Sequence, residues 1–187
     1  MKAIVCHKYG PIDNLEYAEI DDPVPGPEEV VIKTEKIGVN YADGLLVQGL
    51  YQTKPQFPFV PGMEAAGEIV AAGSAVTRWR VGDRVAAFVS TGAYSELVLA
   101  EQNLIFPVDK NADATEVVSL ICGYGTAYHA LKQRARLLEG ETLAVTGAAG
   151  LTGLAAVELG KIMGTKVIAV ASSQKKRDLS DDRGADV

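Results

Sequence analysis

The sequence predicts an α/β protein with a β-rich N-terminal part, and three observations carry this prediction. Runs of alternating or β-branched apolar residues dominate the first two thirds of the chain. After residue 112 the order changes to strand, helix, strand, which is typical of a parallel sheet with right-handed crossovers. A glycine-rich turn, residues 147–153, joins the first of these later strands to its helix. We therefore expect two domains, residues 1–122 and residues 123–187, the second being the first part of a doubly wound domain.

Five strands are predicted in the N-terminal domain. After the first of them, three prolines within residues 21–27 remove backbone donors and fix φ, so we expect a loop there. Gly82 and Asp83 supply a tight turn that leads into a later strand. The predicted strands are Leu15–Ile20, Glu29–Val39, Ala65–Ala72, Arg84–Phe88 and Tyr94–Leu99.

The C-terminal domain is predicted to contain two parallel strands. A doubly wound domain has about six strands, and an open pair of strands cannot bury helices on both of its faces. We therefore expect this sequence to be the N-terminal fragment of a longer chain. The predicted elements are helices Asn111–Leu120 and Gly123–Arg134, strand Thr142–Thr146, helix Leu151–Met163, strand Lys166–Ala171 and helix Gln174–Arg183.

The turn after residue 146 has the spacing of a dinucleotide cradle. It reads Ala148-x-Gly150-x-x-Gly153, so alanine stands where the six-residue fingerprint has its first glycine. Glycine lets the backbone approach a pyrophosphate, and the free N–H groups at the helix start point toward the anion. We predict that the pyrophosphate of a dinucleotide lies against Ala149, Gly150, Leu151, Thr152 and Gly153.

Charge and hydropathy argue against several classes of partner. The chain has 18 basic and 24 acidic side chains, a net charge of −6, which disfavours nucleic acid and anionic membrane surfaces. The longest uncharged stretch, residues 142–157, is too short for a membrane span. Cys6 and Cys122 give no disulfide framework. We expect a cytoplasmic protein whose partner is a small molecule.

Five motifs together match one known family in order and spacing. With them the whole chain resembles the zinc-independent quinone oxidoreductases (zeta-crystallin type) of the medium-chain dehydrogenase/reductase superfamily. The resemblance implies a GroES-like catalytic domain, a Rossmann domain and an active site in the cleft between them. The motifs are Gly38–Asp43, Pro58–Glu64, Gly82–Val85, Tyr124–Leu131 and the turn at residues 147–153.

The chain departs from this family at Leu151 and Thr152, where a glycine followed by valine is more usual. The side chain of Leu151 is expected near the path of the pyrophosphate. Two outcomes are open: the leucine weakens cofactor binding, or it points into the core.

We predict no metal site. Zinc alcohol dehydrogenases of the same superfamily hold their catalytic metal with a cysteine, a histidine and a second cysteine. Here the matching positions are Asn40, Met63 and Cys122, so a single thiol remains. We expect Cys122 to be a small buried hydrophobe and His129 to be a surface residue.

The residues that follow the second predicted parallel strand indicate that the cofactor is NADPH. NAD-selective folds carry an acidic residue at the end of this strand, but here the strand is followed by hydroxyls and cations. By resemblance, Ser172 and Lys176 contact the 2′-phosphate, with Lys175 and Arg177 as alternates. The competing interpretation is that the three cations form the solvated start of a surface helix.

The resemblance places Asn40 beside the nicotinamide or the substrate, where its amide can donate a hydrogen bond to a carbonyl oxygen. Tyr51 offers a phenol donor and a flat stacking face, and Thr126 is expected to contact the nicotinamide. Structural alternatives stay open: Asn40 as a turn residue, Tyr51 as a loop packing residue and Thr126 as a helix cap. We expect Asp43 to orient the local backbone or Tyr41.

The predicted function is NADPH-dependent, zinc-independent hydride transfer to quinones or α,β-unsaturated carbonyls. We also expect a homodimer for the full-length protein. One alternative is a 2-enoyl-thioester reductase, which shares cofactor and fold. Another is a non-catalytic, dinucleotide-binding or structural protein of crystallin type.

Overall fold

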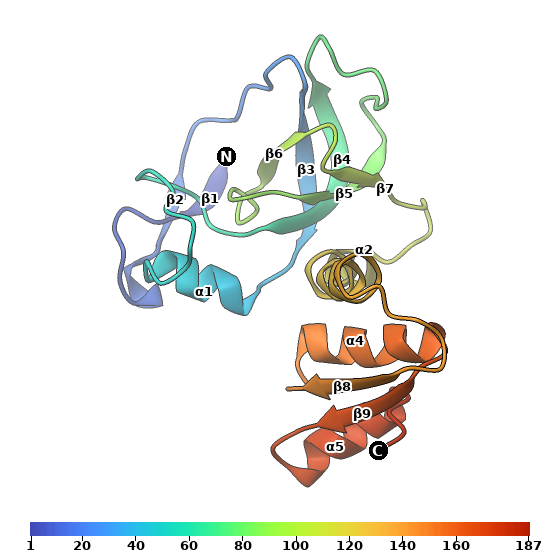
Figure 1. The fold of residues 1–187 in the computed structure, drawn as a ribbon. Helices are drawn as coiled ribbons and strands as arrows, with labels where there is room; N and C mark the ends of the chain where they lie inside the picture. Colours follow the sequence, from blue (N-terminus) through green and yellow to red (C-terminus); the bar gives the residue numbers. More distant parts are fainter. The chain divides into compact units, whose positions relative to one another are not determined.

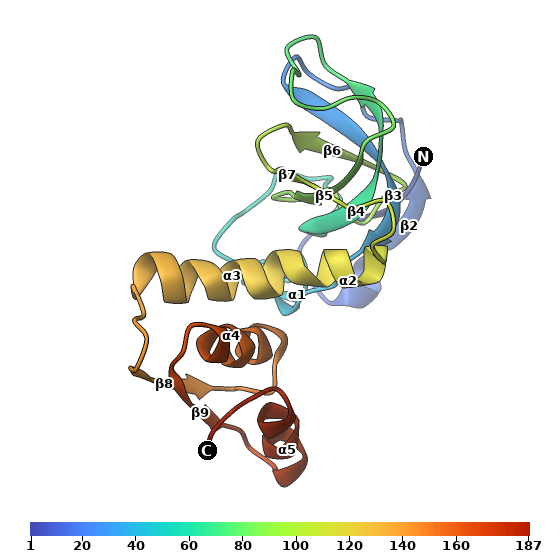
Figure 2. The same ribbon diagram turned by 90° about the vertical axis from the view of Figure 1, so that its right-hand side faces the viewer.

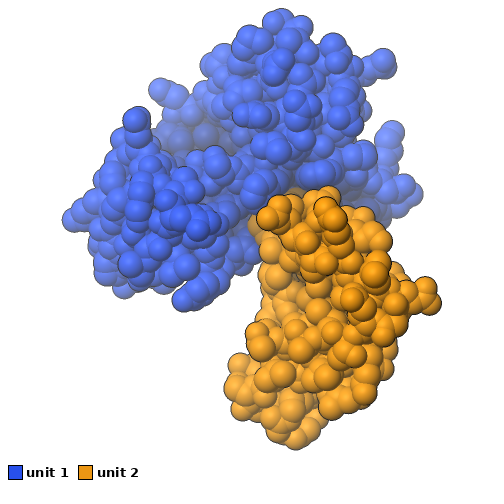
Figure 3. Space-filling model, in the orientation of Figure 1, with its two compact units in different colours: residues 1–119 blue, residues 120–187 orange.

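The computed structural model describes residues 1–187. The chain forms two compact units, residues 1–119 and residues 120–187 (Figure 3). The predicted domain boundary followed residue 122, three residues after the division between the units.

Unit 1 is built on a five-stranded antiparallel sheet of order β6-β3-β4-β5-β7 (Figure 1). Its central strands β3 and β4 carry the core, where Val30, Ile32 and Ile69 are fully buried. Val31, between two of these residues, is buried as well, so both faces of this part of β3 are covered. The bounds are β3 (Glu29–Ile37), β4 (Glu64–Ala72), β5 (Arg84–Phe88), β6 (Leu97–Glu101) and β7 (Ile105–Pro107).

Four elements of unit 1 differ from the prediction. Strand β1 (Lys2–Val5) pairs antiparallel with β2 (Glu16–Glu19), and neither β1 nor β7 was predicted. The strand expected from Tyr94 begins only at Leu97. A seven-residue helix, α1 (Tyr41–Val47), follows β3 where no helix was predicted.

Residues 114–134 are helical throughout, so the break predicted before Gly123 is wrong. The helix α2 (Ala114–Ser119) belongs to unit 1, and its start is capped by Asp113 Oδ1, which accepts from Thr115 N–H at 2.7 Å. In unit 2 the run continues as π-helical and α-helical segments. They are η2 (Leu120–Tyr124), α3 (Gly125–Tyr128) and η3 (His129–Arg134).

Unit 2 contains the predicted strand–helix–strand unit. Strands β8 (Thr142–Thr146) and β9 (Lys166–Val170) are parallel, with α4 (Leu151–Ile162) between them in sequence. Figure 2 shows α4 on one face of the pair and α5 (Gln174–Asp182) on the other. Val145, Val157 and Val167 form its core.

The last residues of the chain continue the sheet of unit 2. Asp186 N–H donates to the Val167 carbonyl at 2.8 Å, and Ala169 N–H donates to the Val187 carbonyl at 2.7 Å. This segment therefore lies beside β9. Across both units, no helix combines the length and the apolar character that crossing a membrane requires.

Candidate functional site

The corner between β3 and α1 places Asn40 at the start of a helix. Its backbone is extended, with φ −112° and ψ 153°, and it is the N-cap of α1. Asn40 N–H donates to Asp43 Oδ2 at 2.8 Å, and Asp43 N–H donates to the Asn40 carbonyl at 3.1 Å. The Asn40 amide Nδ2 donates to Glu64 Oε1 at 2.7 Å. Asn40 thus begins a helix and holds its amide against a carboxylate.

Two carboxylates are buried next to Asn40. The exposed fraction is 3% for Asp43 and 2% for Glu64. Glu64 fits because Gly38 has no side chain: a Cβ there would stand 2.0 Å from Glu64 Oε1. Gly38 N–H also donates to the backbone carbonyl of Glu64 at 3.2 Å. Gly38 of the first sequence motif therefore leaves the space that the Glu64 side chain of the second motif fills.

Tyr94 completes this cluster from the loop before β6. Its hydroxyl donates to Asp43 Oδ2 at 2.8 Å, and its ring lies where a Cβ of Gly62 would stand 2.3 Å from Cδ1. Asp43 orients the local backbone, as expected, but the phenol it binds is Tyr94, while Tyr41 is exposed. Sequence reasoning missed Tyr94, which is separated from Asp43 by 51 residues. It also missed Glu64, whose signal is a charge inside an apolar run.

The environment of Asp43 raises the pKa of its carboxyl above the ordinary value of 3.8. Burial is the main cause, and the nearby charge of Glu64 adds to it. The hydrogen bonds from Asn40 N–H and the Tyr94 hydroxyl oppose the shift. Both bonds end on Oδ2, and Oδ1 is buried with no hydrogen-bond partner. Ionisation of the buried Asp43 carboxyl therefore costs free energy, even with these two hydrogen bonds.

We expect Asp43→Asn to remove a pH dependence of stability. Because the folded-state pKa is raised above 3.8, the folded protein keeps this proton in a pH window where the unfolded chain has lost it. Wild-type stability from this group is therefore present below pH 3.8 and is lost as pH rises through the folded-state pKa. The amide oxygen of asparagine can accept both hydrogen bonds without a charge. Urea unfolding across pH should show the variant gaining on wild type as pH rises, and parallel curves would contradict this.

Tyr51 lies beyond the other end of α1. It is half-buried, and its backbone N–H donates to the Leu45 carbonyl at 3.2 Å. The seven residues of α1 separate it from Asn40, which corresponds to about 10 Å along a helix axis. Asn40 and Tyr51 are therefore at opposite ends of one helix.

In unit 2 the glycine turn has the geometry of a cradle. Gly147 has φ +67°, which favours glycine, and Gly147 N–H and Ala148 N–H both donate to the Val170 carbonyl, at 3.0 and 3.2 Å. A Cβ at Gly153 would stand 2.4 Å from the Gly147 carbonyl oxygen. Gly150 is the N-cap of α4, so the N–H groups of the first turn that follows have no acceptor within the helix.

The side chain of Leu151 lies against Gly123. A Cβ at Gly123 would stand 2.8 Å from Leu151 Cγ, and Leu151 remains 47% exposed. The leucine therefore contacts Gly123 but does not point into the core, and its effect on cofactor binding stays a prediction. The glycine at position 123 makes room for the leucine at position 151.

Ser172 and Lys176 come together after β9. Lys176 Nζ lies 3.5 Å from Ser172 Oγ, both side chains are exposed, and Ser173 is the N-cap of α5. Arg177 Nη1 donates to the Ala171 carbonyl at 3.2 Å. A hydroxyl and two cations thus face the end of the second parallel strand, and Lys175 is exposed beside them.

The remaining predicted residues lie on the helical run. Thr126 is exposed in α3, and because the run begins at Ala114, it does not cap a helix start. Cys122 is half-buried rather than fully buried, and His129 is exposed as expected.

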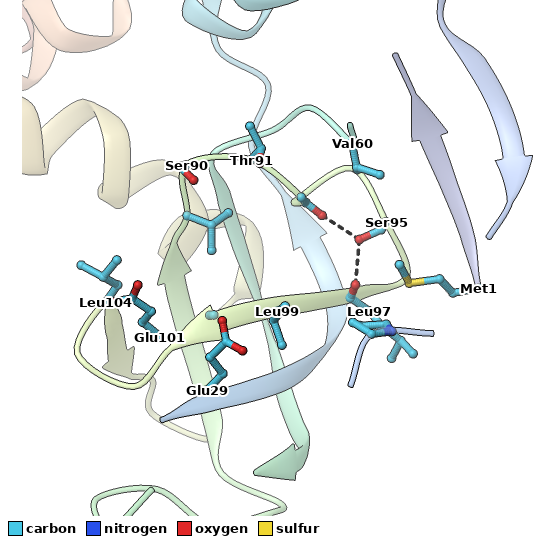
Figure 4. Close-up of a pocket in the computed structure, with 14 residues that line it drawn as sticks. Met1, Glu29, Val60, Ser90, Thr91, Ser95, Leu97, Leu99, Glu101 and Leu104 are labelled. Atoms are coloured by element: carbon cyan, nitrogen blue, oxygen red, sulfur yellow. Dashed lines mark hydrogen bonds between the residues drawn. The ribbon is translucent and has the colours of Figure 1, made fainter. Parts of the chain in front are cut away.

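No group of three or more histidine, cysteine, aspartate or glutamate side chains is placed to hold a metal ion. Unit 1 has a hollow of about 300 Å³ beside β6. Figure 4 shows Ser95 in its wall, with its hydroxyl oxygen 2.7 and 2.8 Å from the Gly92 and Leu97 carbonyl oxygens, either of which can accept its one proton. Asn40, Asp43 and Glu64 do not line this hollow.

Comparison with known families and proteins gives one domain match within unit 1 and similar proteins that match both units. Residues 26–110 match the alcohol dehydrogenase GroES-like domain. Quinone oxidoreductase of Pseudomonas aeruginosa is 40% identical over 186 residues, which are 98% of this chain and 57% of that protein. Quinone oxidoreductase-like protein 2 of Mus musculus is 40% identical over 172 residues, 91% of this chain and 49% of that protein.

A solved structure extends the comparison to the fold. The quinone oxidoreductase of Thermus thermophilus, described with its NADPH complex, has a TM-score of 0.87 and 34% identity. The match covers 100% of this chain and 58% of that one. The chain thus spans about half the length of the curated relatives it matches. The predicted fold class, a GroES-like β domain followed by the first part of a Rossmann domain, is confirmed.

Proposed function

We propose that this chain, which is 40% identical over 98% of its length to a quinone oxidoreductase and carries a GroES-like domain match, is an NADPH-dependent reductase of quinones or α,β-unsaturated carbonyls in the medium-chain dehydrogenase/reductase superfamily. The observation that carries the proposal is the glycine turn followed by the Ser172–Lys176 pair. Relatives with this fold are described as complexes with NADPH.

The residues of unit 2 fit the cofactor. A glycine cradle that a Cβ would fill lies at the start of a twelve-residue helix, a combination that favours a pyrophosphate. The hydroxyl of Ser172 and the ammonium of Lys176 suit a 2′-phosphate, since no carboxylate stands between them. In this proposal residues 149–153 bind the pyrophosphate, and Thr126 contacts the nicotinamide.

Bound NADPH supplies a hydride equivalent for reduction of the acceptor. The chain's own contribution is to stabilise the negative charge that develops on the acceptor oxygen. We assign this to the Asn40 amide, one of whose N–H groups is held by Glu64 while the other is free to donate. Tyr51 supplies a second donor and a stacking surface.

Stopped-flow oxidation of NADPH by the full-length protein tests the reaction. A 1,4-quinone, a simple enone and a 2-enoyl thioester are the three acceptors. We expect turnover with the quinone or the enone. Turnover with the thioester alone identifies a 2-enoyl-thioester reductase instead, and NADPH binding without any turnover identifies a non-catalytic dinucleotide-binding protein.

Lys176→Ala is expected to weaken NADPH binding about tenfold or more and to leave NADH binding unchanged. The reason is that a hydrogen bond from a charged donor to a phosphate contributes about 1.5–3 kcal/mol. Fluorescence titration of both cofactors measures the effect. Lys175→Ala is the matched control, because it removes the same charge one residue away from the Ser172 contact. No loss in either variant would favour a solvated helix start, and a loss in Lys175→Ala alone would assign the phosphate contact to the alternate Lys175.

A further inference from the structure

We propose that Glu64 is a positioning residue that fixes the orientation of the Asn40 amide; the proposal rests on the function proposed above. Glu64 Oε1 accepts from Asn40 Nδ2 at 2.7 Å, and Glu64 is 2% exposed at the start of β4. Gly38 leaves the space that its carboxylate occupies. Gly38 and Asn40 of the first motif and Glu64 of the second therefore form one contact.

The chemistry of the carboxylate determines which end of the amide faces it. Glu64 Oε1 accepts the hydrogen bond from Asn40 Nδ2, so the Nδ2 end of the amide points toward Glu64. An asparagine amide is nearly symmetric in shape, and its two orientations are distinguished only by hydrogen-bond partners. With Nδ2 turned to Glu64, the Asn40 side chain can also accept from the Asp43 backbone N–H in the capping box of α1, and the second N–H of the amide is left for a ligand.

The Glu64 contact is a different hydrogen bond from those of the capping box that begins α1, although the Asn40 side chain takes part in both. The backbone of Asn40 is held by Asp43, which is in turn held by the Tyr94 hydroxyl. Glu64 binds Asn40 through the side-chain Nδ2, whereas the backbone N–H of Asn40 is held by Asp43. We therefore expect a change at position 64 to turn the amide while the bonds of Asp43 keep the helix start folded. Burial of a carboxylate is costly, which fits a role in orientation better than a role in stability.

Glu64→Gln is the direct test in the full-length protein. Glutamine keeps the shape but presents either a donor or an acceptor, so the Asn40 amide loses its single orientation. We expect kcat to fall about tenfold with the KM for NADPH unchanged. In an Asn40→Ala background the same substitution should have no further effect on kcat, because its action passes through the amide. Additive losses in the two backgrounds would overturn the proposal.

A second variant reaches the same contact from the opposite side. Gly38→Ala puts a Cβ in the place of Glu64 Oε1 and should displace the carboxylate, which reproduces the kcat loss of Glu64→Gln. Glu68→Gln, at an exposed position of the same strand, is the matched control and should match wild type.

The side-chain NH₂ resonances of Asn40 give a readout that does not depend on activity. In asparagine-labelled protein, assigned with Asn40→Ala, we expect one hydrogen-bonded and exchange-protected N–H that loses its protection in Glu64→Gln. Unchanged protection overturns the positioning role. Protein that binds NADPH and reduces no acceptor overturns the proposed function, and the resonances then decide the role of Glu64 by themselves.

Discussion

Gly153→Ala is expected to destabilise unit 2 by about 3 kcal/mol and to abolish NADPH binding. The added Cβ would stand 2.4 Å from the Gly147 carbonyl oxygen and 2.8 Å from Ala148 Cα. Both are backbone atoms of a turn that is anchored to the Val170 carbonyl, so neither can move aside cheaply. The helix α4 must shift away from the turn, which disrupts the cradle.

The control for this experiment is the same substitution three residues earlier. A Cβ at Gly150 would stand 3.4 Å from the Gly147 oxygen, and its φ of −82° suits any residue. We expect Gly150→Ala to stay within about 1 kcal/mol of wild type. Hydrogen exchange of residues 147–160 localises the change. Equal protection in the two variants would show that the turn and α4 are not in tight contact.

Local features of the sequence predict much of unit 2 and of the cradle. Glycines, β-branched strands and the helix that follows lie within about forty consecutive residues, and their order fixes a right-handed parallel unit. The break predicted before Gly123 is wrong for a tertiary reason. That glycine accommodates the side chain of Leu151 from α4, a contact which no local pattern records.

Unit 1 shows the limit of local patterns more clearly. Helix α1 has seven residues, too few for a periodic signal, although an Asn40–Asp43 spacing marks its start. Glu64 and Tyr94 join Asn40 and Asp43 only after β3 and β4 have paired. The residue types in the motifs therefore predict which positions belong to the candidate site. Their hydrogen-bond partners cannot be predicted in this way, because they come together only in the folded chain.

Gly67→Ala is expected to have a comparable effect on unit 1, a loss of about 3 kcal/mol in the free energy of unfolding. Gly67 lies in β4 opposite Thr34 of β3, next to a register shift between Thr34 and Lys36. A Cβ there would stand 2.0 Å from the Lys33 carbonyl oxygen. The two central strands would have to separate where the bulge brings their backbones together.

Gly44→Ala is the matched control in the same unit. A Cβ at Gly44 in α1 would meet no atom within 4 Å, and alanine lowers the backbone entropy of the unfolded chain. We therefore expect a gain of about 0.5–1 kcal/mol. Urea unfolding should move the two variants in opposite directions. A Gly67→Ala protein as stable as wild type would mean that β3 can shift at its bulge, and the contact between Gly38 and Glu64 would then be adjustable as well.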